Sequence, residues 1–298
     1  MAKGKKSSKK NNKRSNTGHG HNPAGNLRPS KKLGQNFLID EEVIQDIIDG
    51  SSITEDSLVV EIGPGMGALT EHLVEQAGRL IAVELDDRLI PLLEVKMFGY
   101  DNFELIHGDI LEVDLGEIIR KNKEEYNLKD VRIVGNLPYY ITTPIIMKLM
   151  EQRTQADSIT VMMQKEVGDR LVAEPGTKDV GAITYQVQYY SEVTKVTDAE
   201  SECFYPAPKV DSVVLRMDLR DKPAVELEDE DFFFKVVKAG FMQRRKTLLN
   251  SLMTLGNCSK DEVSSALEKA GIETNRRAES LTMEEFARLA ISLKETIE

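Results

Sequence analysis

The chain has 298 residues, of which 40% are hydrophobic and 30% charged, a balance typical of a globular protein with about two domains. This composition excludes a fibrous, a collagen-like and a wholly disordered chain. The two cysteines, Cys203 and Cys258, lie far apart and form no CxxC pair, so we expect neither a disulfide scaffold nor a cysteine-based zinc site.

Membrane and export signals are not expected from the sequence. It has no run of about 18 apolar residues, so no helix is predicted to span a membrane. Its basic N-terminus lacks the apolar stretch of a secretory signal. We therefore expect a protein of the reducing cytoplasm that has no membrane partner.

Charge is unevenly distributed along the chain, whose net charge is -11. Residues 1–32 carry ten lysines and arginines and no acidic residue, whereas the remainder has 29 basic and 50 acidic residues, a net charge of -21. A basic arm on an acidic body is typical of nucleic-acid binding, and it also fits a tail that only aids solubility. Residues 1–30 are rich in Lys, Ser, Asn and Gly, which predicts a disordered basic arm.

From residue 31 onwards, short apolar runs alternate with longer amphipathic stretches. Asp40 can cap a first helix with apolar positions from Val43 to Ile48, and Gly50 can end it. The elements predicted next are strands at 58–60, 80–83, 103–106, 131–134 and 159–163, helices at 68–76, 89–96 and 145–151, and elements of either type at 182–190 and 212–217. Strands that alternate with helices predict a mostly parallel sheet covered on both faces.

A polar, acidic segment at residues 219–231 predicts a domain boundary. Beyond it, the apolar positions from Phe234 to Leu255 follow a helical period in one stretch that Gly256 can end, and two short helices are predicted at 260–270 and 282–295. The predicted organisation is a basic arm at 1–30, an α/β domain at 31–220 and a small all-α domain at 221–298.

A glycine-rich turn follows the first predicted strand, with the sequence Glu61-Ile62-Gly63-Pro64-Gly65-Met66-Gly67. Glycines suit a backbone that turns tightly and approaches a ligand without an intervening Cβ. The spacing fits the dinucleotide fingerprint and equally the first motif of S-adenosylmethionine-dependent methyltransferases. Glu84 ends the next strand, where both classes place an acid against ribose hydroxyls. These residues alone leave the choice between NAD and S-adenosylmethionine open.

Asp109 follows the third predicted strand and extends this site. A carboxylate at the C-terminal end of a strand faces the crevice in which parallel sheets bind ligands. From there it can accept a hydrogen bond from an adenine amino group. Together with the glycine turn and Glu84, it predicts a nucleoside-binding site.

The sequence after the fourth predicted strand indicates the chemistry. Asn136-Leu137-Pro138-Tyr139 supplies an amide, a carbonyl before a proline and an aromatic face. The amide and the Leu137 carbonyl can accept hydrogen bonds from an exocyclic amine, which localises the nitrogen lone pair for an in-line methyl transfer from a sulfonium. Such catalysis rests on positioning and electrostatics, and it needs no metal ion, covalent intermediate or strong base.

With these motifs the chain resembles the rRNA adenine N6,N6-dimethyltransferases over about residues 31–298, and within them the bacterial small-subunit (16S) branch known for kasugamycin sensitivity. Residues 31–38 match the family's N-terminal cofactor motif, residues 61–70 its first motif and residues 136–144 its catalytic loop. The stretches typical of the small-subunit branch are 175–179, 204–212 and 241–248. The resemblance implies a Rossmann-like methyltransferase domain followed by a small C-terminal all-α domain.

The resemblance also implies roles for individual residues. Asn136, Leu137, Pro138 and Tyr139 form the catalytic loop, and the target adenine lies between Tyr139 and Phe204. S-adenosylmethionine, converted to S-adenosylhomocysteine, is expected to contact Gln35, Asn36, Leu38, Gly63, Gly65, Glu84, Asp109 and Asn136. The residues expected to contact RNA phosphates are Lys209, Arg244, Arg245 and Lys246, because an acidic protein that binds RNA needs local basic patches.

The implied reaction is the dimethylation of two adjacent adenines in the 3′-terminal hairpin loop of 16S rRNA. The implied substrate is a partly assembled small-subunit (30S) precursor, and we expect the enzyme to be a monomer. Unstacked loop adenines suit such a site because they enter a pocket at lower cost.

Four other functions are alternatives to this reaction, and particular residues oppose each of them. A large-subunit rRNA adenine methyltransferase is opposed by residues 204–212 and 244–246, and a DNA adenine methyltransferase would carry a different aromatic-proline tetrapeptide. A non-catalytic RNA-binding assembly factor on the same fold is opposed by the intact loop at 136–139. A nicotinamide oxidoreductase accounts for neither that loop nor residues 35–38.

Overall fold

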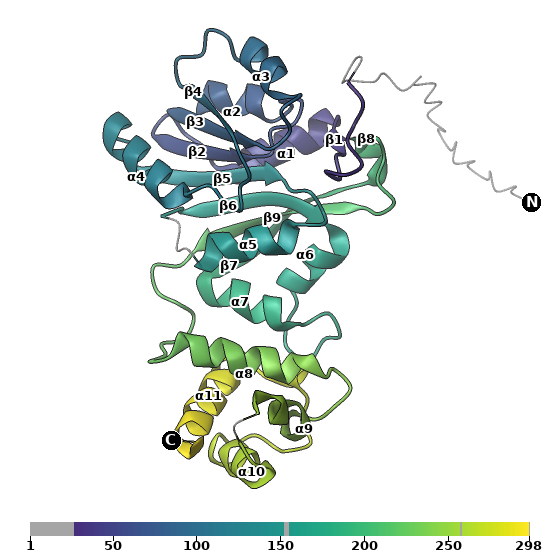
Figure 1. Cartoon of the computed structure of the whole chain (residues 1–298), viewed down its shortest axis with the longest axis vertical. Helices are drawn as coiled ribbons and strands as arrows, with labels where there is room; N and C mark the ends of the chain where they lie inside the picture. The colour runs from purple at the N-terminus through teal and green to yellow at the C-terminus, as the bar shows by residue number, and fades with distance from the viewer. Residues whose placement is uncertain (1–26, 152–154, 257, 298) are drawn as a thin grey trace, which may run out of the picture.

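A computed structural model describes residues 27–151, 155–256 and 258–297 of the chain. The predicted basic arm therefore lies outside the described residues for all but its last four positions. The described part forms an α/β body followed by a group of helices (Figure 1).

The α/β body is built on a seven-stranded sheet with the strand order β4-β3-β2-β5-β6-β9-β7. Its strands are β2 (Ser57–Ile62), β3 (Arg79–Glu84), β4 (Phe103–His107), β5 (Asp130–Asn136), β6 (Ser158–Gln164), β7 (Ser191–Ala199) and β9 (Ser212–Leu219). The first five strands in the order are parallel, and β9 and β7 are antiparallel to their neighbours. The prediction of a mostly parallel sheet is confirmed. A separate short antiparallel pair joins β1 (Phe37–Leu38) to β8 (Phe204–Tyr205).

Both faces of the sheet are covered by helices, because successive strand residues point to opposite sides. In β2, Val59 packs into the cluster of α1 and α2, whereas Leu58 and Val60 pack into the cluster of α4 and α5. The helices of the body are α1 (Glu41–Ser51), α2 (Thr70–Gln76), α3 (Ile90–Lys96), α4 (Leu115–Tyr126), α5 (Thr142–Glu151), α6 (Lys165–Leu171) and α7 (Ala182–Tyr190).

Local signals explain where these elements begin and end. Asp40 caps α1 as predicted, its carboxylate accepting from the Val43 amide at 3.0 Å. The prediction that Gly50 ends α1 is wrong, because the helix continues to Ser51 and Ser52 takes the left-handed conformation. Gly50 instead lies so close to β7 that an added Cβ would lie 2.7 Å from Val196 Cγ1.

The sequence interpretation missed several elements, namely α4, α6, β7, β1 and β8. Helix α4 has little apolar signal, because its surface is mostly charged and only Leu115, Ile119 and Asn122 are buried. Strand β7 carries an alternating polar pattern at the sheet edge, with a bulge between Lys195 and Thr197. Such elements are stabilised by their neighbours more than by a local apolar signal.

The C-terminal helices pack against α7 as well as against one another. They are α8 (Glu230–Met242), α9 (Leu248–Leu252), α10 (Lys260–Lys269) and α11 (Met283–Ile297), with 3-10 turns at Met253–Leu255 and Ala278–Ser280. Their apolar cluster includes Tyr185 and Tyr189 of α7, while Val187 of the same helix belongs to the sheet cluster. Helix α7 is thus shared between the two cores (Figure 1), and the domain boundary at residues 220 and 221 remains a prediction.

The predicted single helical stretch from Phe234 to Leu255 is wrong, because the structure breaks it at residues 243–247. Hydrogen bonds from distant segments hold the break. The Leu248 amide donates to the Arg276 carbonyl at 2.8 Å, and the Arg244 guanidinium donates to the Lys178 carbonyl at 2.6 Å. The end of the stretch at Gly256 is confirmed by its φ of 80°. None of the described helices has the length and apolarity that crossing a membrane requires.

We expect Gly168→Ala to destabilise the fold by about 1–3 kcal/mol, because α6 packs onto β9 with no room for a methyl group. An added Cβ at Gly168 would lie 2.2 Å from Val213 Cγ1. Urea unfolding should show this loss. It should also show that the double variant Gly168→Ala/Val213→Ala loses less stability than the sum of the losses of the two single variants.

Gly116→Ala in α4 is the matched control, because its added Cβ would come no closer than 3.5 Å to any neighbouring atom, Asp114 Oδ1 being the nearest. It should stabilise the protein by about 0.5–1 kcal/mol. An unchanged stability of Gly168→Ala would contradict the close packing of α6 on β9.

Candidate functional site

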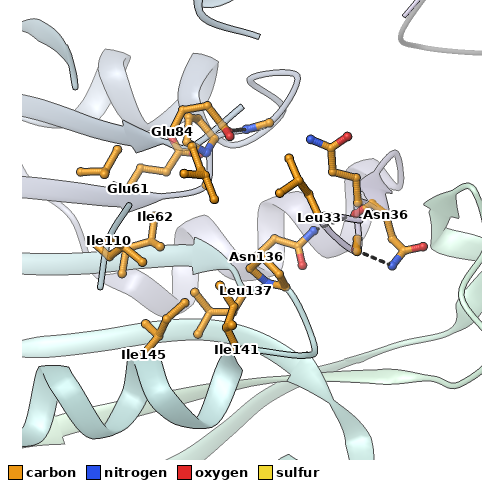
Figure 2. A pocket seen from close by; sticks show the side chains of 18 of the residues that line it. Leu33, Asn36, Glu61, Ile62, Glu84, Ile110, Asn136, Leu137, Ile141 and Ile145 are labelled. Atoms are coloured by element: carbon orange, nitrogen blue, oxygen red, sulfur yellow. Dashed lines mark hydrogen bonds between the residues drawn. The ribbon is translucent and has the colours of Figure 1, made fainter. Parts of the chain in front are cut away.

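A cleft of about 1040 Å³, its open mouth included, lies at the carboxyl ends of the parallel strands β2, β3, β4 and β5 (Figure 2). Parallel sheets bind ligands at this edge. The cleft brings together every predicted cofactor residue and the whole catalytic loop: Gln35, Asn36, Leu38, Gly63, Gly65, Glu84, Asp109, Asn136, Leu137, Pro138 and Tyr139. Their individual roles remain predictions.

The glycine turn brings backbone close to the cleft. Gly63 and Gly65 have φ values of 68° and 60°, in the left-handed region that disfavours any residue with a Cβ. The Gly65 amide donates to Glu84 Oε2 at 3.0 Å, which ties the turn after β2 to the end of β3. An added Cβ at Gly65 would lie 3.3 Å from the Phe37 ring, so this turn also supports the segment that covers it.

Glu84 is held from both sides by backbone amides. Its second oxygen, Oε1, accepts from the Asp86 amide at 2.8 Å, and only 6% of the residue is exposed. Burial raises the pKa of this carboxyl, while the two amides favour its charged form. Each oxygen keeps a free lone pair, so Glu84 is oriented to accept hydrogen bonds from ligand hydroxyls.

Glu61 is a second acid of the cleft, and the sequence interpretation gave it no role. It is 1% exposed, and its Oε2 has no hydrogen-bond partner in the described part of the chain. Burial raises its pKa to about 8, and the nearby Glu84 carboxylate adds to the rise. Its position at the strand end, two residues before Gly63, is the sequence signal that could have identified it.

A polar network attaches the N-terminal segment to the turn after β3. Gln35 Nε2 donates to Asp86 Oδ2 at 2.7 Å, and Gln35 Oε1 accepts from the Ser30 amide at 2.7 Å. Arg88 donates to both oxygens of Asp86, which lowers the pKa of that carboxyl. Both polar atoms of the Gln35 side chain therefore bond to other residues of the protein, and these bonds position residues 30–35 at the cleft.

Asn136 connects the catalytic loop to the same segment. Its Nδ2 donates to the Asn36 carbonyl at 3.1 Å, so the acceptor atom left for a ligand is Oδ1 (Figure 2). The side-chain amide of Asn36 donates to the Gly34 carbonyl at 3.1 Å. Asp109 also lines the cleft, with one oxygen accepting from the Leu111 amide at 2.9 Å.

The rest of the catalytic loop is rigidly held. The Pro138 carbonyl accepts from the Ile141 amide and from the Thr142 hydroxyl. The hydroxyls of Tyr139 and Ser212 form a hydrogen bond of 2.6 Å, and burial raises the pKa of Tyr139. These contacts fix the ring of Tyr139 at the cleft.

Phe204 is not brought to the cleft beside Tyr139. It is 3% exposed, pairs with Leu38 in the β1–β8 ribbon and packs into the apolar cluster of α1. It does not line the described cleft. A base stacked between Tyr139 and Phe204 would require this ring to become accessible, and that arrangement remains a prediction.

The predicted phosphate-contact residues Lys209, Arg244, Arg245 and Lys246 are all exposed. Arg244 has a structural role as well, because its guanidinium donates to the carbonyls of Lys178 and Val180. Among the described residues, no group of three or more His, Cys, Asp or Glu side chains is placed to hold a metal ion.

Sequence comparison relates the chain to enzymes that modify rRNA. The family described as "Ribosomal RNA adenine dimethylase" matches residues 26–295. The ribosomal RNA small subunit methyltransferase A of Clostridium acetobutylicum is 48% identical over 265 residues, 89% of this chain and 94% of that protein. Its counterpart from Geobacillus thermodenitrificans is 48% identical over 266 residues, 88% of this chain and 90% of that protein.

Two solved structures share the fold over most of the chain. A dimethyladenosine transferase from Plasmodium falciparum has a TM-score of 0.73 and 26% identity, covering 87% of this chain and 98% of that one. The 23S rRNA methyltransferase ErmE has a TM-score of 0.66 and 27% identity, covering 87% of this chain and all 100% of that one. The methyltransferase fold expected from the sequence, with its C-terminal helices, is thereby confirmed.

The buried Glu61 should make stability depend on pH. The pKa of this carboxyl is about 8 in the folded chain, whereas that of a free glutamate is about 4.5, so the folded state binds more protons between these two pH values. Stability therefore falls as the pH rises through this window. Urea unfolding between about pH 6 and 8.5 should show a smaller loss of stability for Glu61→Gln than for the wild type.

The exposed Glu75 of α2 offers a matched control, and Glu75→Gln should keep the pH dependence of the wild type. Equal pH dependence of Glu61→Gln and the wild type would contradict the protonated state assigned to Glu61.

Proposed function

The chain belongs to the ribosomal RNA adenine dimethylase family and is an S-adenosylmethionine-dependent rRNA methyltransferase, and on this premise we propose that it dimethylates N6 of two adjacent adenines in the 3′-terminal hairpin loop of 16S rRNA. The observation that carries the proposal is one cleft that joins the Gly65–Glu84 nucleoside site to the Asn136–Tyr139 loop. The proposed substrate is a small-subunit precursor in the cytoplasm, and the proposed enzyme is a monomer.

The choice of ribosomal subunit is supported by the degree of similarity. The relatives named for the small subunit are 45–48% identical to this chain, whereas the 23S rRNA methyltransferase ErmE is 27% identical. Small-subunit rRNA is therefore the favoured substrate, and large-subunit rRNA is the alternative that an experiment has to exclude.

The residues that line the cleft fit the proposed cofactor. In this proposal Glu84 accepts from ribose hydroxyls, Asp109 accepts from an adenine amine, and the unpartnered Oε2 of Glu61 accepts from a further donor. When bound, S-adenosylmethionine supplies an electrophilic methyl group on its sulfonium.

The chain's own contribution to the transfer is to position the target amine. Asn136 Oδ1 and the Leu137 carbonyl accept hydrogen bonds from the exocyclic amine of adenine, which favours a tetrahedral nitrogen with a localised lone pair. The ring of Tyr139, fixed through Ser212, stacks on the base and holds it in the cleft. In this mechanism no step is assigned to a metal ion.

Transfer of labelled methyl groups to ribosomal subunits tests the proposal. Small and large subunits from cells that lack both methylations are incubated with the enzyme, and the modified adenines are mapped by primer extension. Label in the 3′ hairpin of the small subunit is expected. Label in the large subunit alone would overturn the substrate assignment, and cofactor binding without any label would favour a non-catalytic role.

In the same assay, Asn136→Ala should lower methyl transfer by roughly 100-fold or more, because it removes the aligned acceptor for the amine together with the hydrogen bond to the Asn36 carbonyl. Binding of the ribosomal subunit should stay close to that of the wild type, which separates chemistry from recognition. Asn250→Ala, at an exposed position of α9, should retain full activity. Full methylation by Asn136→Ala would contradict the proposed mechanism.

The basic turn between α8 and α9 should contribute phosphate contacts. Replacing Arg245 and Lys246 together by alanine should make subunit binding less sensitive to salt. The magnitude of the slope of log association constant against log salt concentration should fall by about 1.5, because each phosphate contact contributes about 0.7–0.9 to that slope. Arg244 is left unchanged because it also holds Lys178 and Val180.

A double variant of the same charge serves as the control. Arg120 and Lys121 are exposed neighbours on α4, and their joint replacement by alanine should leave the salt slope unchanged. Equal slopes for both double variants would remove Arg245 and Lys246 from the RNA-binding surface.

A further inference from the structure

Tyr140, the residue after the catalytic tetrapeptide, is an exposed aromatic side chain at the cleft. It lines the same cavity as Tyr139, yet 55% of it is exposed, whereas Tyr139 is fixed by Ser212. Neither the proposed cofactor contacts nor the proposed methyl transfer uses this ring. An exposed tyrosine held at the entrance of an RNA-modifying site therefore needs a separate explanation.

The ring of Tyr140 is supported by the turn at residues 30–35. Gly34 has a φ of 61°, and an added Cβ there would lie 3.2 Å from Cδ1 and 3.4 Å from Cε1 of Tyr140. The turn is closed by hydrogen bonds from Leu33 and Gln35 to the Ser30 carbonyl. One edge of the ring thus rests on a fixed backbone, while 55% of the residue is exposed.

The charge around this ring favours a nucleic acid. Lys31 and Lys32 lie in the same turn, and both are exposed. Positive side chains beside an exposed aromatic ring are the usual composition of single-stranded nucleic-acid sites, where the ring stacks on a base and the charges attract the phosphate backbone. The two lysines attract any polyanion, and the exposed ring favours RNA over an acidic peptide because a base can stack on it.

We propose that Tyr140 stacks on a nucleotide that flanks the target adenine, and so acts as a second base-binding residue beside Tyr139. The inference rests on the proposed function and deepens it, because it states how the RNA next to the reacting base is held. The ring of Tyr140 takes no part in methyl transfer in this proposal. It affects how tightly unpaired RNA binds, and the chemical step depends on Asn136 and its neighbours.

Steady-state kinetics on small subunits that lack the methylation tests this role. Tyr140→Ala should raise KM for the subunit roughly tenfold, as expected for the loss of one base–aromatic stack, and change kcat by less than about twofold. Tyr140→Phe should behave as the wild type, because stacking does not need the hydroxyl. The Kd for S-adenosylmethionine should be unchanged in both variants.

Phe98→Ala provides the matched control. Phe98 is 89% exposed and does not line the cleft, so its loss removes an exposed ring without touching the site. This variant should keep the wild-type KM. An unchanged KM in Tyr140→Ala would overturn the proposal. The proposal would also be overturned if KM for the subunit rose as much in Tyr140→Phe as in Tyr140→Ala. A tenfold rise in the Kd of Tyr140→Ala for S-adenosylmethionine would overturn it as well.

A binding measurement separates this inference from the proposed function. A short hairpin RNA with 2-aminopurine next to the target position should lose fluorescence when it binds the wild type or Tyr140→Phe, and lose much less with Tyr140→Ala. If the wild type methylates no small subunit but this difference persists, the proposed function fails and the stacking role stands. If methylation is normal but the three proteins quench equally, the stacking role fails alone.

Discussion

The hydrogen bond from the Asn136 side chain to the Asn36 carbonyl is the interaction on which the organisation of the site depends. It joins the end of β5 to a segment 100 residues earlier in the chain, and it fixes the orientation of the amide, whose acceptor atom Oδ1 stays available. One contact therefore joins two sides of the cleft and orients the group expected to face the target amine. The β1–β8 pair and the Gln35–Asp86 hydrogen bond hold the same segment at two further places. The site is thus assembled from distant parts of the chain around a fixed backbone.

The cleft also contains buried acids that destabilise the ligand-free protein. Glu61 is almost fully buried with an unpartnered oxygen, and Glu84 is buried with only backbone amides as partners. Burial of a carboxyl group without a matching charge is unfavourable, which is why the pKa values of both are raised. Such groups are typical of binding sites, where a ligand supplies the missing donors. The surrounding apolar clusters on both faces of the sheet provide the stability that tolerates them.

Much of the fold and part of the site were predictable from local patterns. The buried strands β2, β3, β5 and β6 are short apolar runs, and the predicted cofactor residues Gly63, Glu84 and Asn136 lie at the ends of the first three, which a parallel sheet brings to one edge. Elements without an apolar run, such as α4 and β7, were missed because burial against neighbours stabilises them. The turn at residues 243–247 was missed because bonds to Lys178 and Arg276, far away in the sequence, interrupt a helical pattern.

The sequence by itself determined the apolar strands, the glycine turn, the acids at the strand ends and the Asn136–Tyr139 tetrapeptide, because each depends on residues within a few positions of one another. The tertiary structure alone decided which of these groups are free to act. It bound Gln35 to Asp86 and Arg244 to Lys178, buried Phe204 beside Leu38, left Oε2 of Glu61 without a partner and left Tyr140 exposed. These outcomes depend on contacts between segments distant in sequence, whose geometry is set only when the sheet and its covering helices pack together.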